Sequence, residues 1–179
     1  GRQYTKNSRP VKRRRSRTNN TNAVVMKTFI DYHNLREEVE PVPVKKEPDS
    51  ISLNIGGTDY KLEVADKPDK IYKGMSGRKS IPRKTGMLFD MPSEDKQSFC
   101  MRDCMCNMDL VYANKKGEIK GLHRMTAERP KRKTETDIQY NKRLKNYDSD
   151  GPAKYAIELP AGDITRLGLK QNQIINIPK

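Results

Sequence analysis

The sequence has few of the residues that build membrane spans or base-stacking surfaces. Among its 179 residues it contains no Trp, 6% aromatic residues and 33% hydrophobic residues. No stretch approaches the roughly 20 apolar residues that a membrane-spanning helix needs, and no apolar segment follows the basic N-terminus as in a secretory signal. We therefore expect an intracellular or virion protein that is neither secreted nor membrane-bound. The shortage of aromatic residues also disfavours recognition of single-stranded nucleic acid by stacking.

Cysteine and histidine are also scarce, which limits disulfide and catalytic chemistry. The three cysteines are Cys100, Cys104 and Cys106, and an odd, clustered set is a poor disulfide framework and typical of a reducing compartment. With only His33 and His123, a catalytic pair would have to be built on one of these two side chains. The sequence contains no P-loop, G-x-G-x-x-G or HExxH motif. We expect no enzymatic activity and no cofactor.

Acidic residues are missing from the first 27 positions, which carry a concentrated positive charge instead. Nine Lys and Arg residues lie there, out of a net charge of +14 for the chain, whereas residues 28–179 have 28 Lys and Arg against 23 Asp and Glu. Crowded cations resist compaction and gain free energy by displacing counterions from a phosphate backbone. This arm is therefore a candidate nucleic-acid contact, to DNA or RNA. Its candidate phosphate-binding residues are Arg9, Lys12, Arg13, Arg14, Arg15 and Arg17.

Two other interpretations of the arm stay open. Residues 12–17 also fit a generic basic localisation signal, which is a weak motif. Alternatively, the arm docks on acidic surfaces of neighbouring protein subunits and needs no polynucleotide. A mildly apolar segment follows, whose candidate partner-docking residues are Val24, Val25, Phe29 and Ile30. Three prolines between positions 39 and 48 predict an extended linker, so residues 1–48 form an arm with a linker and residues 49–179 a β-rich domain.

Alternating apolar and polar residues predict a mostly β domain. In the first hairpin, residues 51–55 join 60–64 through the turn Gly56-Gly57, and one face stays in water. The other expected strands are at 108–113, 118–125, 155–159 and 174–177. Helices are expected at 135–147 and 160–167, and a short one starts at Asp66 to Pro68 and is ended by Gly74 or Gly77. Short strands separated by turn signals favour a small β-sandwich or a partly open barrel with short helices.

The second hairpin positions the conspicuous polar residues. A turn centred between positions 115 and 116 puts Met108 opposite His123 and Tyr112 opposite Ile119. Asp109 then points to the other face from His123, so the two are not members of one catalytic triad. We expect Asp109 to satisfy backbone groups at a strand end instead.

The cysteine cluster offers one metal-binding alternative. Cys100, Cys104 and Cys106 have the same parity, so on a regular strand their thiols point to one face, where His123 could complete a Cys3His zinc site. Zinc ligands usually come from tight knuckles or separate loops, and small core residues are the simpler interpretation. We therefore predict no metal site and keep this set as the alternative.

Several separate blocks between residues 58 and 177 occur in the order of a known family. They are Gly74-Met75, Arg78, Gly86-Met87-Leu88-Phe89, Phe99, Met101, Asp109, Gly151-Pro152-Ala153 and Glu158-Leu159-Pro160-Ala161-Gly162. On these blocks the chain resembles family 192 of the domains of unknown function. The resemblance implies a compact, jelly-roll-like β-rich fold without an assigned reaction, in which Arg78 and Asp109 belong to the family-motif surface.

The chain also departs from that family pattern. Residues 128–146 resemble a basic, helical insertion into a loop that the family keeps shorter, and the cysteines stand where the family usually has aromatic or apolar residues. We predict a non-enzymatic structural or accessory subunit of a large nucleoprotein assembly, of virion or ribosome-associated type, that contacts neighbouring subunits and nucleic acid. A free-standing nucleic-acid-binding protein and a small metal-dependent enzyme are the alternatives.

Overall fold

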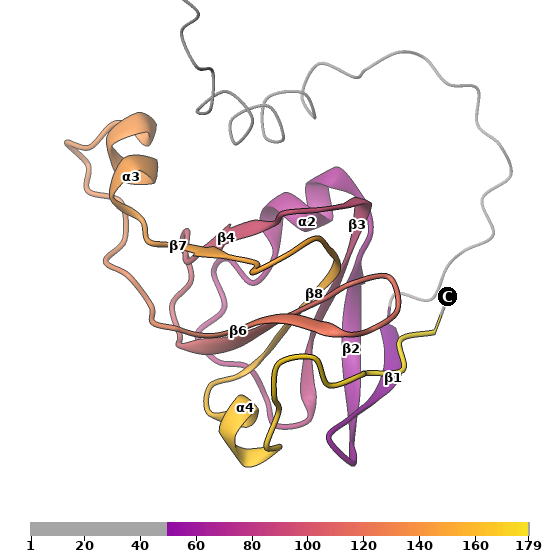
Figure 1. Cartoon of the computed structure of the whole chain (residues 1–179). Coiled ribbons are helices and arrows are strands. Elements are labelled where there is room, and N and C mark those ends of the chain that lie inside the picture. Colours follow the sequence, from indigo (N-terminus) through magenta and orange to yellow (C-terminus); the bar gives the residue numbers. More distant parts are fainter. Residues whose placement is uncertain (1–49, 179) are drawn as a thin grey trace, which may run out of the picture. The chain divides into compact units, whose positions relative to one another are not determined.

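The computed structural model of the chain describes residues 50–178 (Figure 1). Its strands are β1 (Ser50–Ile55), β2 (Thr58–Ala65), β3 (Thr85–Asp95), β4 (Ser98–Cys100), β5 (Met108–Ala113), β6 (Ile119–Met125), β7 (Asn146–Asp148) and β8 (Ala153–Pro160). Its helices are α2 (Pro68–Lys73), α3 (Asp137–Arg143) and α4 (Asp163–Arg166). Within residues 50–178, none of the helices has the length and apolar character required to cross a bilayer.

A six-stranded mixed sheet forms the centre of the domain, in the order β1-β2-β3-β8-β5-β6, and β4 pairs with β7 in a separate two-stranded sheet. β2 and β3 are parallel, and the other neighbouring strands are antiparallel. A parallel pair needs a crossover connection, and α2 lies in it. β1 and β6 are the outer strands of the sheet, so the described strands do not close into a barrel. The mostly β prediction is confirmed at this level.

The first predicted hairpin is confirmed, including its wet face. Leu53 pairs with Tyr60 across β1 and β2, and both side chains are buried, whereas Lys61 is exposed. Gly56 and Gly57 have φ values of 55° and 78°. These positive values suit glycine, which has no Cβ to clash in this conformation.

The second hairpin forms, but its predicted register is wrong. His123 lies opposite Leu110 rather than Met108, and Tyr112 lies opposite Gly121 rather than Ile119. A longer turn and a bulge between Tyr112 and the next pair together shift the partners by two residues. Because strand side chains alternate with period two, the even shift leaves His123 on its predicted face, whereas the bulge puts Ile119 on the face of Ala113 and away from Tyr112.

The predicted helices are confirmed in part. Gly74 follows the last residue of α2, as expected, and α4 lies within the predicted range 160–167. The predicted helix 135–147 is too long, because β7 follows α3 and Tyr147 pairs with Phe99 of β4. The predicted C-terminal strand 174–177 is wrong: Ile174 forms only an isolated bridge with Glu118.

The inner strands of the central sheet are covered on both faces. On one face, Leu62 and Ile157 pack with Ile164 of α4 and with the C-terminal Ile175. On the other face, side chains from β3, β5 and β8 pack with Tyr147 of β7 and with residues of the loop 101–107. β5 is buried along its whole length, and the five residues of β8 after Lys154 are also buried. A polar residue on these inner strands therefore lies inside the domain, whichever face it points to.

Candidate functional site

The N-terminal candidates lie outside the described residues. This holds for the predicted phosphate-binding set and for the partner-docking set, and both therefore stay predictions. The former comprises Arg9, Lys12, Arg13, Arg14, Arg15 and Arg17, and the latter Val24, Val25, Phe29 and Ile30. Within residues 50–178, the remaining candidates are the basic insertion, the environment of Arg78, Asp109 on β5, and the cysteines with His123.

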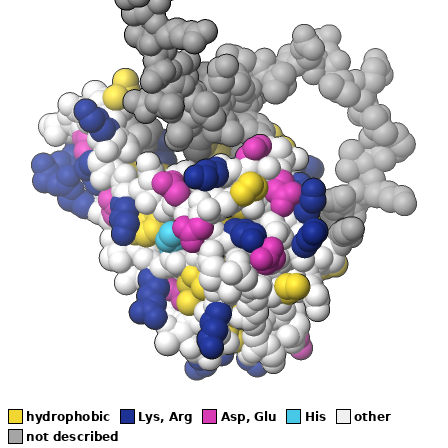
Figure 2. All heavy atoms as spheres, in the orientation of Figure 1, with side chains coloured by type: hydrophobic (Ala, Val, Ile, Leu, Met, Phe, Trp, Pro, Cys, Tyr) yellow, Lys and Arg dark blue, Asp and Glu magenta, His cyan; other side chains and the backbone are white. Residues whose placement is uncertain are grey.

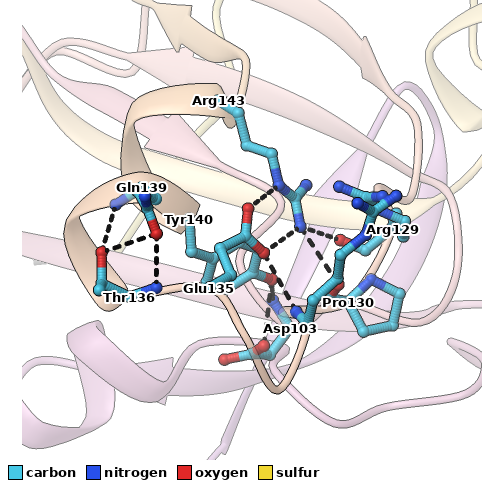
Figure 3. Close-up of polar contacts among 9 residues, drawn as sticks. Asp103, Arg129, Pro130, Glu135, Thr136, Gln139, Tyr140 and Arg143 are labelled. Carbon is cyan, nitrogen blue, oxygen red and sulfur yellow. Dashed lines mark hydrogen bonds and ion pairs between the residues drawn. The ribbon is translucent and has the colours of Figure 1, made fainter.

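The insertion, residues 128–146, contains α3, which begins with a capping box (Figure 3). The Thr136 hydroxyl accepts a hydrogen bond from the backbone N–H of Gln139, and the Gln139 side chain accepts one from the backbone N–H of Thr136. Two N–H groups of the first turn are thereby satisfied. The buried Tyr140 donates its hydroxyl hydrogen to the Asp103 carboxylate (3.1 Å) and accepts a hydrogen bond from the Asp103 N–H (2.9 Å). These bonds attach α3 to the loop 101–107.

Arg143 holds the preceding loop against α3. Its guanidinium donates to the Glu135 carboxylate at 2.7 Å and to the carbonyl oxygens of Arg129 and Pro130 at 2.9 and 3.1 Å (Figure 3). The hydrogen bonds from Arg143 and from the backbone of Arg132 lower the pKa of Glu135 to about 2. Glu135 is therefore charged at neutral pH and remains a partner for Arg143.

Positive charge dominates the insertion. Residues 128–146 contain seven Lys and Arg against three Asp and Glu, a net charge of +4. Two of these carboxylates are paired within the insertion, Glu135 with Arg143 and Asp137 with Lys131. Figure 2 shows Lys and Arg side chains gathered at the end of the domain where α3 lies. The exposed cations without a carboxylate partner among residues 50–178 include Arg129, Lys133 and Lys142.

Arg78 lies at a cavity beside α2. Its two terminal nitrogens donate to the two carboxylate oxygens of Glu63 at 2.8 and 2.6 Å, a bidentate pair. The loop that carries Arg78 is fixed to the loop 101–107, because the Gly77 N–H donates to the Asp103 carbonyl and the Ser76 hydroxyl to the Arg102 carbonyl. The cavity has a volume of about 280 Å³ between β2, α2 and this loop.

Glu158 is a buried carboxyl group on β8, on the sheet face to which Glu63 and Met87 also point. In the strand register, Glu63 pairs with Met87, Met87 with Glu158, and Glu158 with Leu110. Glu158 is only 4% exposed, and its Oε2 atom has no hydrogen-bond partner among the described residues. Desolvation raises its pKa to about 8, against a smaller lowering by Arg78. Glu158 is thus mostly protonated at neutral pH.

Asp109 has the role that the sequence predicted for it. Its side chain is 1% exposed and accepts a hydrogen bond from the backbone N–H of Ile164 at the start of α4. A neighbouring network joins Tyr60 to Asp163, at 2.5 Å, and Asp163 to Arg166, at 2.8 Å. Asp109 therefore positions α4. Its assignment to a surface shared with Arg78 is wrong, because Asp109 is buried on the side of its partner Leu159, whereas Arg78 binds Glu63 on the side of Met87.

The cysteines do not share a strand, so the geometric premise of the zinc alternative is wrong. Cys100 ends β4, whereas Cys104 and Cys106 lie in the loop that follows. His123 is on β6, with Nε2 2.7 Å from the carbonyl oxygen of Asp148. Among residues 50–178, no three His, Cys, Asp or Glu side chains converge as metal ligands. Burial raises the pKa of each thiol, that of Cys104 to about 12.

A six-stranded mixed sheet with a small second sheet and three short helices defines a mostly β domain that carries a basic insertion. The chain belongs to the DUF192 family, described as "Uncharacterized ACR, COG1430", whose model matches residues 51–177. The family resemblance seen in the sequence blocks is thereby confirmed. The comparison with curated proteins gives no match.

Two solved structures share this fold. One is a protein from Sinorhizobium meliloti 1021 described as a "putative transcription regulator", with 23% identity and a TM-score of 0.56 over 70% of this chain and 89% of that one. The other is a protein of unknown function from Novosphingobium aromaticivorans DSM 12444, with 18% identity and a TM-score of 0.58 over 79% of this chain and 95% of that one. At these identities the likeness concerns the fold alone.

Sequence reasoning missed the relation between Glu63, Arg78 and Glu158. Arg78 was singled out as a motif residue, but its partner is 15 positions away on β2 and Glu158 is 80 positions away on β8. One signal was available, since Glu158 interrupts an otherwise apolar run between Ile157 and Leu159. The alternation at 155–159 predicted a strand but not the burial of Glu158, which the second layer over the sheet produces.

Proposed function

We propose that this protein is a non-enzymatic structural or accessory subunit of a large nucleoprotein assembly, of virion or ribosome-associated type. The observation that carries the proposal is a second cationic element besides the arm. The insertion has a net charge of +4, which is most of the +5 of residues 28–179. Hydrogen bonds within the insertion fix the backbone that presents these side chains.

Two cationic elements suit a phosphate backbone better than a single localisation signal does. A localisation signal needs only the short basic run at 12–17. It would not account for exposed cations elsewhere, such as Lys133 and Lys142. Lys and Arg on separate elements contact phosphates without reading base sequence. The proposed partners are therefore nucleic acid and neighbouring protein subunits inside a cell or virion.

The finer description of the fold, a jelly-roll-like or partly open barrel, is part of the same proposal. The two-stranded β4–β7 sheet packs on one face of the central sheet through Phe99 and Tyr147, whose rings lie near Tyr112 and His123. This second layer supports a sandwich-like arrangement, in which the insertion between β6 and β7 extends from the edge.

The test is binding of the full-length protein to generic duplex DNA and to structured RNA across a salt series. Two charge variants are compared with the natural chain: Arg13, Arg14, Arg15 and Arg17→Gln, and Arg129, Lys133 and Lys142→Gln. For duplex DNA, each cation in contact with phosphate contributes about 0.9 to the slope of log K against log salt. We expect both variants to flatten the slope, each by up to about 0.9 per removed contact.

Lys96→Gln is the matched control, because Lys96 is exposed and lies between β3 and β4, outside both cationic elements. Its slope should equal that of the natural chain. Equal slopes for all variants would overturn the nucleic-acid part of the proposal and favour an arm that docks on acidic protein subunits. Tight binding to short free duplexes, with no larger assembly formed, would favour the free-standing nucleic-acid-binding alternative.

A further inference from the structure

The cavity beside α2 combines cations with an apolar wall. Arg78, from the loop after α2, and Lys73, at the end of α2, supply the positive charge. Val64, Ala65 and Met87 supply most of the apolar wall. A volume of about 280 Å³ is just below the range of sites for drug-sized ligands, so the occupant is small.

Arg78 is oriented for a carboxylate by the contact it already makes. Both terminal nitrogens meet the two oxygens of Glu63 in a bidentate arrangement, which is the geometry that a guanidinium adopts with any carboxylate. The Glu63 side chain is 52% exposed, and exposed ion pairs contribute little net free energy. A ligand carboxylate can therefore replace Glu63 at small cost.

Glu158 is the register partner of Met87, which lines the cavity. Glu63, Met87 and Glu158 form one register row across β2, β3 and β8, so all three side chains are on the same face, and neighbouring strands are about 4.8 Å apart. Met87 is part of the cavity wall, and Arg78 acts electrostatically on Glu158. The Oε2 atom of this carboxyl group is buried without a hydrogen-bond partner among residues 50–178. An unsatisfied buried polar atom costs free energy unless a ligand or water pairs with it.

We propose that this cavity binds a small organic carboxylate, which takes the place of Glu63 at Arg78 and packs its alkyl group on Met87. Lys73 adds a second positive charge at the rim. The site is separate from the basic insertion, and the inference does not rest on the proposed nucleic-acid contacts.

Butyrate is the probe, and butyramide is its uncharged counterpart of similar shape. The full-length protein carries ¹³C-methyl-labelled methionine, and the methyl resonances are followed by NMR during titration. We expect the Met87 resonance to shift saturably with butyrate and not with butyramide. The Met125 resonance, from a buried side chain on β6, should stay unchanged and reports that the fold is intact.

Three variants test the roles of the charged residues. Arg78→Gln should weaken butyrate binding at least tenfold, and Lys73→Gln, at an exposed position, should weaken it by a smaller factor. Glu63→Gln should strengthen it, by up to about fivefold, because the internal competitor is gone. A Met87 shift that is equal for butyrate and butyramide, or that persists in Arg78→Gln, would overturn the proposal. So would weaker binding in Glu63→Gln while the Met125 resonance is unchanged.

Discussion

The carboxylate of Asp109, near the start of β5, accepts a hydrogen bond of 2.7 Å from the backbone N–H of Ile164, 55 residues further along the chain. The N–H groups of the first turn of a helix have no partner within the helix. Asp109 satisfies one of them at the start of α4 and connects β5 to the C-terminal part of the domain. Ile164 in turn packs in the hydrophobic cluster with Leu159 and Leu169.

Replacing Asp109 should therefore destabilise the domain. We expect Asp109→Ala to lower the free energy of unfolding by about 1–3 kcal/mol, because a buried N–H group loses its acceptor. Urea unfolding measures the change. Asp150→Ala, at an exposed position, is the control and should stay within about 0.5 kcal/mol of the natural chain. Equal stability of both variants would show that Asp109 does not hold α4.

Glu158 should make stability depend on pH in a direction unusual for a carboxyl group. Its pKa is about 8 in the folded domain and near 4.5 in its ordinary state, so the folded state retains the proton between these values. Stability is then fully present below about pH 4.5 and falls as the pH rises through 8. Glu158→Gln removes this loss and should be more stable than the natural chain at pH 8 by a few kcal/mol, at about 1.4 kcal/mol per pKa unit.

The contribution of Glu63 to stability should depend on pH in the opposite direction, which Glu63→Gln tests. The hydrogen bonds from Arg78 lower the pKa of Glu63, so its contribution is present above the ordinary pKa and is lost as the pH falls. Thermal unfolding of both variants at pH 5 and pH 8 separates the two effects. A Glu158→Gln variant whose advantage is the same at both pH values would contradict a raised pKa for Glu158.

Arg143 should control the order of the insertion without affecting the core. Arg143→Ala removes the hydrogen bonds to Glu135 and to the carbonyl oxygens of Arg129 and Pro130. We expect faster tryptic cleavage within residues 128–146, since local opening exposes the backbone, and little change in the unfolding midpoint of the domain. Lys142→Ala, on the same helix but without a carboxylate contact in the described part of the chain, should leave the cleavage rate elsewhere in the insertion unchanged.

The cysteines should react slowly and in a fixed order. The thiolate is the reactive form, and burial raises the pKa of all three thiols, that of Cys104 to about 12. Cys104 is also the only one of the three that is fully buried. With iodoacetamide at pH 8, mass spectrometry should find Cys104 modified last and all three modified more slowly than free cysteine. Rapid modification of Cys104 would show that the loop 101–107 opens readily.

Local patterns in the sequence were enough to predict the elements formed by residues close in the chain, such as hairpins and short helices. The alternation around Gly56-Gly57 predicted the first hairpin, and Pro68 and Gly74 bounded α2, because turn formation and helix ends depend on residues close in the chain. The strand β3, by contrast, was not predicted. It pairs in parallel with β2 and antiparallel with β8, and neither pairing has a local turn signal.

The sequence by itself determined the charge of the arm and insertion, the mostly β composition and the family, since these follow from residue types and their order. Only the tertiary structure decided which residues are buried and which meet. Glu63, Met87 and Glu158 come into one row through the register of three strands, and the layer with Phe99 and Tyr147 covers that face. Burial and register depend on contacts between distant segments, so the strand pattern of residues 155–159 did not show that Glu158 is a buried acid with a raised pKa.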